Sequence, residues 1–373
     1  MKGRLAWKIR DLHDQYGPVW RGVEEDLWTT LTGVPKVLDG RGIAPASIGS
    51  RRTLATEELG RHTRLRRAIN SAFSERALRE KEYYFQNYIK TFLKQIRKIP
   101  HDGPVDMSLI SPLKHPPVAL KTQTNRGFAS LTESASKDFF SYILANNQED
   151  KLTDIELTML ASTFIVVGSG TAAGGLASIT YLLLRNPKTL EKLKAEIRAA
   201  FNKEEEITMV STQNCKYLRA CITEGMRLYP PTPGTLPRWV PGKGEFVEGQ
   251  WVPGGYAVGV NQLAAGHSEV NFHRSGEFLP ERWLDVGLDS EFASDDRTAS
   301  QPFSLGSRNC IAKSMANAEM ALTIAMLLWN FELELYEPLE DWWFKQGTFV
   351  VWEKLTLLVN LYPRADSDKA AGK

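Results

Sequence analysis

The longest feature in the pattern of hydrophobic and polar residues is an uncharged stretch over 157–184. Thr153 and Glu156 precede it with the spacing of a capping box, which marks the start of a helix, and Pro187 follows its end. We therefore predict one helix over 153–185, which would be about 50 Å long at roughly 1.5 Å per residue. A helix of this length can cross a large domain.

Three interpretations of this stretch differ in what surrounds it. Its length would suit a transmembrane helix, but its four glycines and seven serine or threonine residues argue against a lipid-facing span. The sequence Gly168-Ser-Gly170-Thr171-Ala-Ala also fits the phosphate-binding turn of a dinucleotide-binding fold. However, the segment 187–201 that follows has helical spacing instead of the required second strand. We favour a buried helix whose small residues let a ligand press against it.

The remaining hydrophobic periodicity predicts further helices and a few short strands. Residues 100–135 differ, because they contain five prolines and show little periodicity. The pattern indicates a mainly α-helical fold with small β-sheets, in a single domain over 1–363 followed by a polar tail over 364–373. The expected helices cover 4–16, a segment from Leu59, 74–99, 135–146, 187–201 and 211–229, and the expected strands cover 235–240, 245–247, 256–260 and 331–335.

Charge and cysteine content narrow the class of protein. The 46 basic and 44 acidic residues leave a net charge of +2, which argues against a nucleic-acid-binding protein with a broad basic surface. The three cysteines form no Cys-x-x-Cys pair and no signal peptide precedes them, which fits a reducing compartment. The N-terminal sequence Met1-Lys-Gly-Arg-Leu is too charged for a membrane anchor. We therefore expect no nucleic-acid partner and no transmembrane anchor.

The candidate chemistry lies in the segment Phe303-Ser-Leu-Gly306-Ser-Arg308-Asn-Cys310-Ile-Ala312, just before an apolar segment of helical composition over 311–329. A cysteine at a helix N-terminus faces free N–H groups and the positive end of the helix dipole, which favour the metal-binding thiolate. Gly306 lets the backbone lie close to a flat object, and Arg308 can pair with an anionic group on it. These features suit an axial haem ligand. The alternative is a buried structural cysteine that enters a core helix.

This segment resembles the haem-binding signature of cytochromes P450, Phe-x-x-Gly-x-Arg-x-Cys-x-Gly, and departs from it in Ala312, where the family usually has Gly. Glu224 and Arg227 resemble the family's Glu-x-x-Arg pair, and Arg282 in Phe278-Leu-Pro-Glu-Arg-Trp283 resembles the arginine that joins it. The resemblance implies a buried network of these three residues, whereas an ordinary surface ion pair would contribute roughly 0–1 kcal/mol.

Further positions match the family's haem and oxygen sites. His62 and Arg66, one helical turn apart, resemble the donors that a helix sends to the haem propionates, and Arg238 and Arg308 resemble two more. Read without the resemblance, these residues would be a solvated basic face and a sheet-edge charge. Gly168 and Thr171 resemble the residues that form the oxygen-binding groove in the family's central helix.

The resemblance implies a P450-type fold, a monooxygenase activity and haem b held by Cys310 as the axial iron ligand. It is closest to P450s of fungal secondary metabolism, of the isotrichodermin-hydroxylase type. The resemblance also implies O2 and an apolar small molecule as substrates. The electrons would come from NADPH through NADPH–cytochrome P450 reductase. The family suggests the cytoplasmic face of the endoplasmic reticulum membrane.

Three departures from the family change these expectations. The family's N-terminal membrane helix is absent, so we expect a cytoplasmic or peripheral protein with at most peripheral membrane contact. Only about 30 residues separate Met107 from Asp138, so the substrate roof is shortened and some helices are missing. Gly170 replaces the acid that usually precedes Thr171 and helps deliver protons. The alternatives are therefore non-hydroxylating haem chemistry, such as rearrangement or dehydration, and a truncated, catalytically silent P450-like protein.

Overall fold

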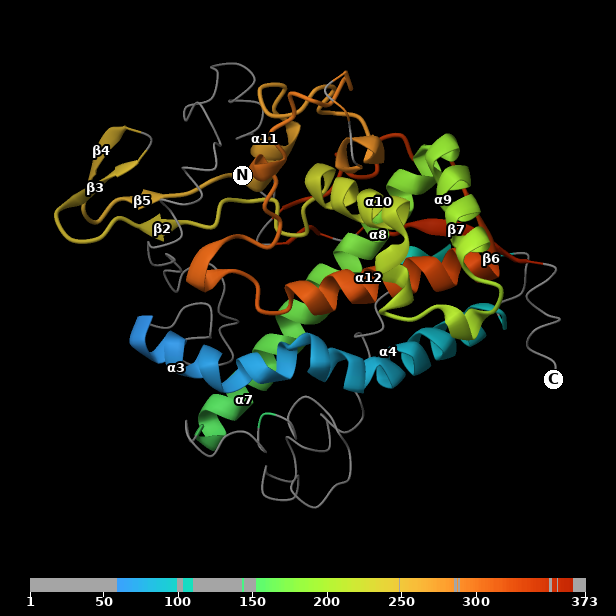
Figure 1. The fold of residues 1–373 in the computed structure, drawn as a ribbon, viewed down its shortest axis with the longest axis horizontal. Coiled ribbons are helices and arrows are strands. Elements are labelled where there is room, and N and C mark those ends of the chain that lie inside the picture. The colour runs from blue at the N-terminus through green and yellow to red at the C-terminus, as the bar shows by residue number, and fades with distance from the viewer. Residues whose placement is uncertain are drawn as a thin grey trace.

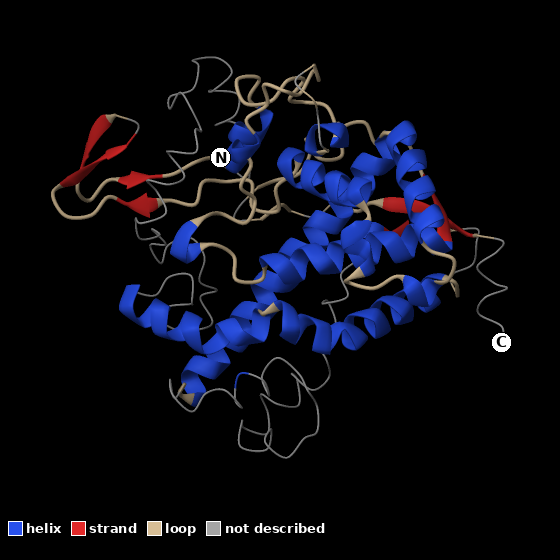
Figure 2. Cartoon of the chain, in the orientation of Figure 1, coloured by secondary structure: helices blue, strands red, loops and turns tan. Residues whose placement is uncertain are grey.

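The structure is a computed structural model, drawn in Figures 1 and 2. It describes residues 59–98, 103–109, 143, 152–247, 249–284, 287, 289–348, 351–353 and 355–364. The helix expected over 4–16, most of the helix expected over 135–146, most of the shortened segment between Met107 and Asp138 and most of the tail lie outside these residues. The described part is mainly helical with small antiparallel sheets, as predicted.

The uncharged stretch forms one continuous helical path through the middle of the molecule (Figure 1). It consists of α7 (Asp154–Thr163), the π-helical segment η5 (Phe164–Gly168) and α8 (Ser169–Arg185). The predicted capping box is present, because the Thr153 hydroxyl accepts from the Glu156 N–H and the Glu156 carboxylate accepts from the Thr153 N–H. The predicted single helix is therefore confirmed in its extent but is interrupted by a π segment.

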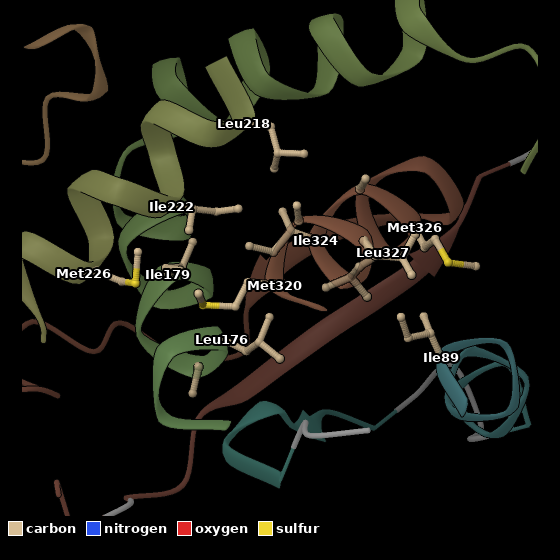
Figure 3. Packing of buried hydrophobic residues seen from close by; sticks show 14 of the residues in the cluster. Ile89, Leu176, Ile179, Leu218, Ile222, Met226, Met320, Ile324, Met326 and Leu327 are labelled. Carbon is tan, nitrogen blue, oxygen red and sulfur yellow. The ribbon is translucent and has the colours of Figure 1, made fainter. Parts of the chain in front are cut away.

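Five further helices pack around this path. They are α3 (Leu59–Asn70), α4 (Glu75–Ile96), α9 (Pro187–Ala200), α10 (Lys216–Leu228) and α12 (Lys313–Asn330). Figure 3 shows the core where α8, α10 and α12 meet, filled by side chains such as Ile179, Ile222 and Ile324. At the contact of α10 with α8, a Cβ added to Gly225 would lie 2.5 Å from Ile179 Cγ1, so these helices need a glycine there.

The small sheets border this helical core. In the first, β7 (Leu358–Pro363) lies between β1 (Val105–Asp106) and β6 (Phe331–Leu335), all antiparallel. The second pairs β2 (Arg238–Trp239) with β5 (Ala257–Val258), and the third pairs β3 (Gly244–Val247) with β4 (Gln250–Pro253). All four expected strands exist. β2 and β5 are shorter than predicted, β3 begins one residue earlier and β6 has the predicted bounds, whereas β1, β4 and β7 were not predicted.

Short helical turns complete the described chain. They are α11 (Gln262–His267) and the 3-10 segments η1 (Ser71–Phe73), η2 (Met107–Leu109), η6 (Glu204–Glu206), η7 (Ser211–Asn214), η8 (Pro280–Trp283), η9 (Arg297–Ala299) and η10 (Gly306–Arg308).

The transmembrane interpretation of 157–184 does not hold. Within the described residues, no helix is both long enough and apolar enough to span a bilayer. Instead, most side chains of α8 are buried by protein. The dinucleotide-binding interpretation also fails, because Gly168 and Gly170 lie within the helical path and α9 follows where a second strand would be needed.

Candidate active site

The loop that carries Cys310 folds back on itself through two backbone hydrogen bonds. The Cys310 N–H donates to the Phe303 carbonyl at 2.8 Å, and the Asn309 N–H donates to the Gly306 carbonyl at 3.0 Å. Gly306 has a φ of 76°, a left-handed conformation that favours glycine, and Ser304 has a φ of 57°. The left-handed backbone turn at Gly306 therefore explains why a glycine is needed there, in addition to any close approach of the backbone to a flat ligand.

The expectation that Cys310 begins the following helix is wrong. Helix α12 begins at Lys313 with Ala312 as its N-cap, and Asn309 before the cysteine has an extended backbone. The bond from the Cys310 N–H to Phe303 holds the cysteine in the loop instead. Phe303 and Ala312 both pack against the hydrophobic core, so the loop is anchored at its two ends.

The three cysteines differ in exposure and therefore in chemistry. Cys310 is exposed, whereas Cys215 and Cys221 are buried. Burial raises the pKa of Cys215 to about 11 and raises the pKa of Cys221 well above its ordinary value, so both remain neutral thiols. Cys310 is thus the cysteine whose sulfur can reach a ligand.

Arg66 brings helix α3 onto this loop. Its Nη1 donates to the Asn309 carbonyl at 2.7 Å, and its Nη2 donates to the Asn309 side-chain oxygen. Burial lowers the pKa of Arg66, while negative charge at Cys310 acts in the opposite direction. His62, one turn earlier on α3, is also buried at 4% exposure.

Two buried arginines lie close together beside the loop. Arg238 and Arg308 are 4% and 5% exposed. Arg238 donates to the Leu236 carbonyl at 3.1 Å and to the Ser304 hydroxyl at 3.3 Å. Burial and the nearby charge of Arg308 lower the pKa of Arg238 to about 10.

This arrangement fits the carboxylates of a haem. Among the described residues, the Nε of Arg238 is buried without a hydrogen-bond acceptor, and Arg238 forms no ion pair. A buried guanidinium such as that of Arg238 is unfavourable unless an anion lies beside it. Carboxylates on a flat ligand bound at Cys310 would supply that anion, so the residues present match the group that the sequence predicts.

The central helix offers open space where the sequence predicts an oxygen groove. A Cβ at Gly168 or Gly170 would meet nothing within 4 Å, and the π segment ends at Gly168. π segments inside α-helices occur frequently at functional sites. The Thr171 hydroxyl donates to the Val167 carbonyl at 2.8 Å, so within the described chain its hydrogen bond stays in its own helix.

A buried network joins Glu224, Arg227 and Arg282, with side chains 0% exposed. The Glu224 carboxylate accepts from Nε and Nη2 of Arg227, each at 2.8 Å, and from Nε of Arg282 at 3.0 Å. Burial would raise the pKa of Glu224, but the two guanidinium groups lower it below its ordinary value. These residues are therefore not the surface ion pair that was the alternative.

The network has members that the sequence did not reveal. Asp295 accepts from Arg282, and the Trp283 indole N–H donates to Glu224 at 2.8 Å. Phe272 lies under both guanidinium groups, 4.9 Å from Arg227 and 5.7 Å from Arg282. Asp295 follows Arg282 in a turn-rich segment without periodic spacing, so no pattern pointed to it.

A pocket of about 540 Å³ opens beside the Cys310 loop. Phe303 and the buried side chains of Leu78 and Met226 line its apolar part. The exposed residues Arg79, Arg219 and Lys313 also line it, together with Glu75. This side of the loop therefore combines an apolar floor with a predominantly positive rim.

Comparisons with known proteins find similarity to one family. A family model described as Cytochrome P450 matches residues 120–359. Cytochrome P450 monooxygenase alt3 of Alternaria solani is 50% identical over 98% of this chain and 86% of its own length. Cytochrome P450 monooxygenase alt1 of the same organism is 35% identical over 98% of this chain and 85% of its own length. An averantin hydroxylase of Aspergillus parasiticus is 32% identical over 98% of this chain and 88% of its own length.

The alignment with alt3 runs over 439 positions, more than the 373 residues of this chain, so that relative contains residues with no counterpart here. The similarity nevertheless extends over nearly the whole chain and is shared with several fungal monooxygenases. The chain therefore belongs to the cytochrome P450 family and is a P450-type monooxygenase, with a haem cofactor, a redox partner and O2.

Proposed function

We propose that this protein hydroxylates an apolar secondary metabolite, with haem b bound through Cys310. The observation that carries this proposal is the exposed Cys310 in a fixed loop beside the buried pair Arg238 and Arg308. In this proposal Arg238, Arg308, His62 and Arg66 hold the propionates. Phe303, Gly306 and Ala312 shape the loop, and Glu224, Arg227 and Arg282 keep its surroundings rigid.

When bound, a haem with a thiolate ligand supplies O2 activation, and electron donation from the sulfur favours O–O cleavage. The residues of the chain would then manage water and protons. Gly168 and Gly170 leave room beside the central helix, and the oxygen of Thr171 can accept a hydrogen bond from water while its proton stays with Val167. Thr171 would therefore position water rather than act as the acid.

The substrate class follows from the relatives and from the residue chemistry together. One relative is named for hydroxylation of averantin, and 50% identity to alt3 places this chain among similar fungal enzymes. We propose an apolar small molecule as substrate, because no charged side chain lies within 157–184, which forms the central helix.

We propose NADPH–cytochrome P450 reductase as the electron donor, at the cytoplasmic face of the endoplasmic reticulum membrane. The positive residues Arg79, Arg219 and Lys313 beside the Cys310 loop support an acidic partner surface on this side. Charge complementarity of this kind raises association rates and makes them sensitive to salt.

Gly170 favours a second candidate, a haem enzyme with non-hydroxylating chemistry. No carboxylate precedes Thr171, so proton supply would be the weak step of hydroxylation. An added Cβ at Gly170 meets nothing within 4 Å, so Gly170→Glu can be accommodated and would place a carboxyl beside Thr171.

The experiment that tests the proposal compares wild type and Gly170→Glu in the presence of NADPH and reductase, with Gly170→Gln as the uncharged control. We expect the wild type to oxidise NADPH with much peroxide release, and the Glu variant to release less peroxide per NADPH than the Gln variant. A native turnover that needs no NADPH and is lost in the Glu variant would contradict hydroxylation. A haem-loaded wild type that oxidises no NADPH would favour a silent protein.

A further inference from the structure

Two buried polar side chains on α12 have no hydrogen-bond partner in the described part of the chain. They are Glu319, which is 0% exposed, and Thr323, which is 2% exposed. Both carboxylate oxygens of Glu319 and the hydroxyl of Thr323 are unpaired among the described residues. The two residues are four positions apart and are therefore neighbours on one face of the helix. Because buried polar groups are nearly always hydrogen-bonded, such a pair indicates bound internal water or a functional role.

The carboxyl group of Glu319 holds a proton. The protein alone buries this side chain, so a haem bound at Cys310 cannot be its partner. A buried carboxyl group without a donor or a cation beside it is stable only in its neutral form. Burial alone accordingly raises the pKa of Glu319 to about 8. The chain therefore stores a proton inside α12 at neutral pH, independently of the haem site.

The stored proton lies beside the part of the central helix that follows Thr171. Met320, the next residue of α12, packs against α8, where a Cβ added to Gly175 would lie 3.2 Å from Met320 Sδ. Figure 3 shows Met320 beside Leu176 of α8. Gly175 is four residues after Thr171, so both lie on the same face of α8. The face of α8 that meets α12 is thus the face that carries Thr171 one turn earlier.

Glu319 is the only acidic residue on either of these two helices. The stretch 157–184 has no charged residue, and the sequence of α12 contains no other Asp or Glu. Gly170 stands where the family has a carboxyl group before Thr171. Hydroxylation with O2 consumes protons together with electrons and releases water, so the site at Thr171 needs a proton supply from another residue.

We propose that Glu319 is a proton reservoir for the oxygen site at Thr171 and replaces the acid that Gly170 lacks. Water held by Glu319 and Thr323 takes up the carboxyl proton and passes a proton on to the water that Thr171 positions. A proton from solvent then restores Glu319, so the carboxyl group returns to its starting state in each turnover. Glu319 acts through water and is therefore not itself a catalytic residue. This inference rests on the proposed function, hydroxylation with O2.

Three variants of the haem-loaded protein test this role. Glu319→Gln removes the acidic proton but keeps the size and polarity of the side chain. Thr323→Val keeps the acid and removes the neighbouring hydroxyl at nearly constant volume. Met326→Leu is the matched control, because it changes another fully buried side chain of α12 and no titratable group.

The first readout is the infrared spectrum of the haem-loaded protein at neutral pH, which needs no turnover. The wild type should show the carbonyl stretch of a protonated, buried carboxyl group. We expect Glu319→Gln to lack this band, Thr323→Val to shift it and Met326→Leu to keep it. If wild type and Glu319→Gln have the same carboxyl bands, Glu319 holds no proton and the proposal is wrong.

The second readout is the coupled fraction, meaning the share of oxidised NADPH that is not recovered as peroxide in the presence of reductase. We expect Glu319→Gln to lower this fraction at least twofold and Thr323→Val to lower it as well, whereas Met326→Leu should match the wild type. In the Gly170→Glu background, Glu319→Gln should have no such effect, because the new acid beside Thr171 supplies the proton. A merely structural role of Glu319 would lower the coupled fraction in both backgrounds.

Equal coupled fractions in wild type and Glu319→Gln, or an equal fall in both backgrounds, would overturn the proposal. If Glu319→Gln does not fold, Thr323→Val decides, because an unchanged band together with an unchanged coupled fraction would exclude this water path. A haem-loaded wild type that oxidises no NADPH would instead contradict the proposed function, and with it this inference.

Discussion

Two buried glutamates show how residue environment decides protonation. Glu224 is surrounded by donors from Arg227, Arg282 and Trp283, and its pKa lies below the ordinary value. Glu319 is 0% exposed in α12, and among the described residues neither of its carboxylate oxygens has a hydrogen-bond partner. Burial raises the pKa of Glu319 from 4.5 to about 8, so this side chain is neutral at neutral pH.

The raised pKa of Glu319 predicts a loss of stability with rising pH. Above pH 4.5 the unfolded chain releases this proton, while the folded chain retains it until about pH 8. The free energy of unfolding should therefore fall between these values, by ~1 kcal/mol per pH unit from this group, and the loss is complete above the folded pKa. Glu319→Gln should flatten this slope, which urea unfolding at several pH values would measure. If the free energy of unfolding depends on pH equally in the wild type and in Glu319→Gln, the pKa of Glu319 is not raised, and the prediction is wrong.

Removal of one partner from the buried network should cost folding and haem retention rather than rate alone. We expect Glu224→Ala and Arg282→Ala each to lower the free energy of unfolding by roughly 3–5 kcal/mol, because each leaves an uncompensated buried charge. The exposed pair of Arg76 and Glu80 provides the control, since Glu80→Ala should change stability by about 0.5 kcal/mol or less. Near-normal melting temperatures for both network variants would refute a structural role.

At the scale of elements, the glycines of the central helix differ from the glycine of α10 that packs against it. Gly225 of α10 meets α8 at Ile179, whereas Gly168 and Gly170 face open space. The start of α7 is tied to α3, because the carboxylate of Glu156 both completes the capping box and pairs with Arg61 and Arg64. The helix that carries Arg66 is thereby joined to the central helix.

The two kinds of glycine predict opposite effects of the same substitution. Gly225→Ala should destabilise the protein by about 1–3 kcal/mol, because its Cβ would lie 2.5 Å from Ile179 Cγ1. Gly170→Ala should stabilise it by about 0.5–1 kcal/mol, because the helix gains a better former and nothing is displaced. Thermal unfolding would measure both. Ile179→Ala combined with Gly225→Ala should cost less than the sum of the single variants, and full additivity would argue against this contact.

Several elements could be predicted from the sequence because their signals are local. The capping box at Thr153, the uncharged run after it and the three-residue spacing of Glu224 and Arg227 all lie within one helix. The π segment, the start of α12 at Lys313 and the partners Asp295 and Asn309 could not be predicted. They depend on contacts between distant segments, such as the Arg66–Asn309 bond across 243 residues, which local periodicity does not encode.

At the scale of the whole molecule, the described helices and small sheets surround one site built from three separate regions. Helix α3 supplies Arg66, strand β2 supplies Arg238, and the loop before α12 supplies Arg308 and Cys310. The buried network of Glu224 ties helix α10 to the segment around Arg282 that precedes this loop. The account therefore predicts that haem binding and folding are coupled, since one ligand joins elements from both ends of the described chain.

The most direct test of the central claim is the spectrum of the reduced CO complex of purified wild type and Cys310→Ala. We predict one haem per chain and a thiolate-type Soret band in the wild type, and loss of this band in the variant. Cys221→Ala is the matched control, because Cys221 is a buried neutral thiol and its replacement should leave the band in place. A thiolate-type band that persists in Cys310→Ala, or that is absent from the wild type, would contradict the account.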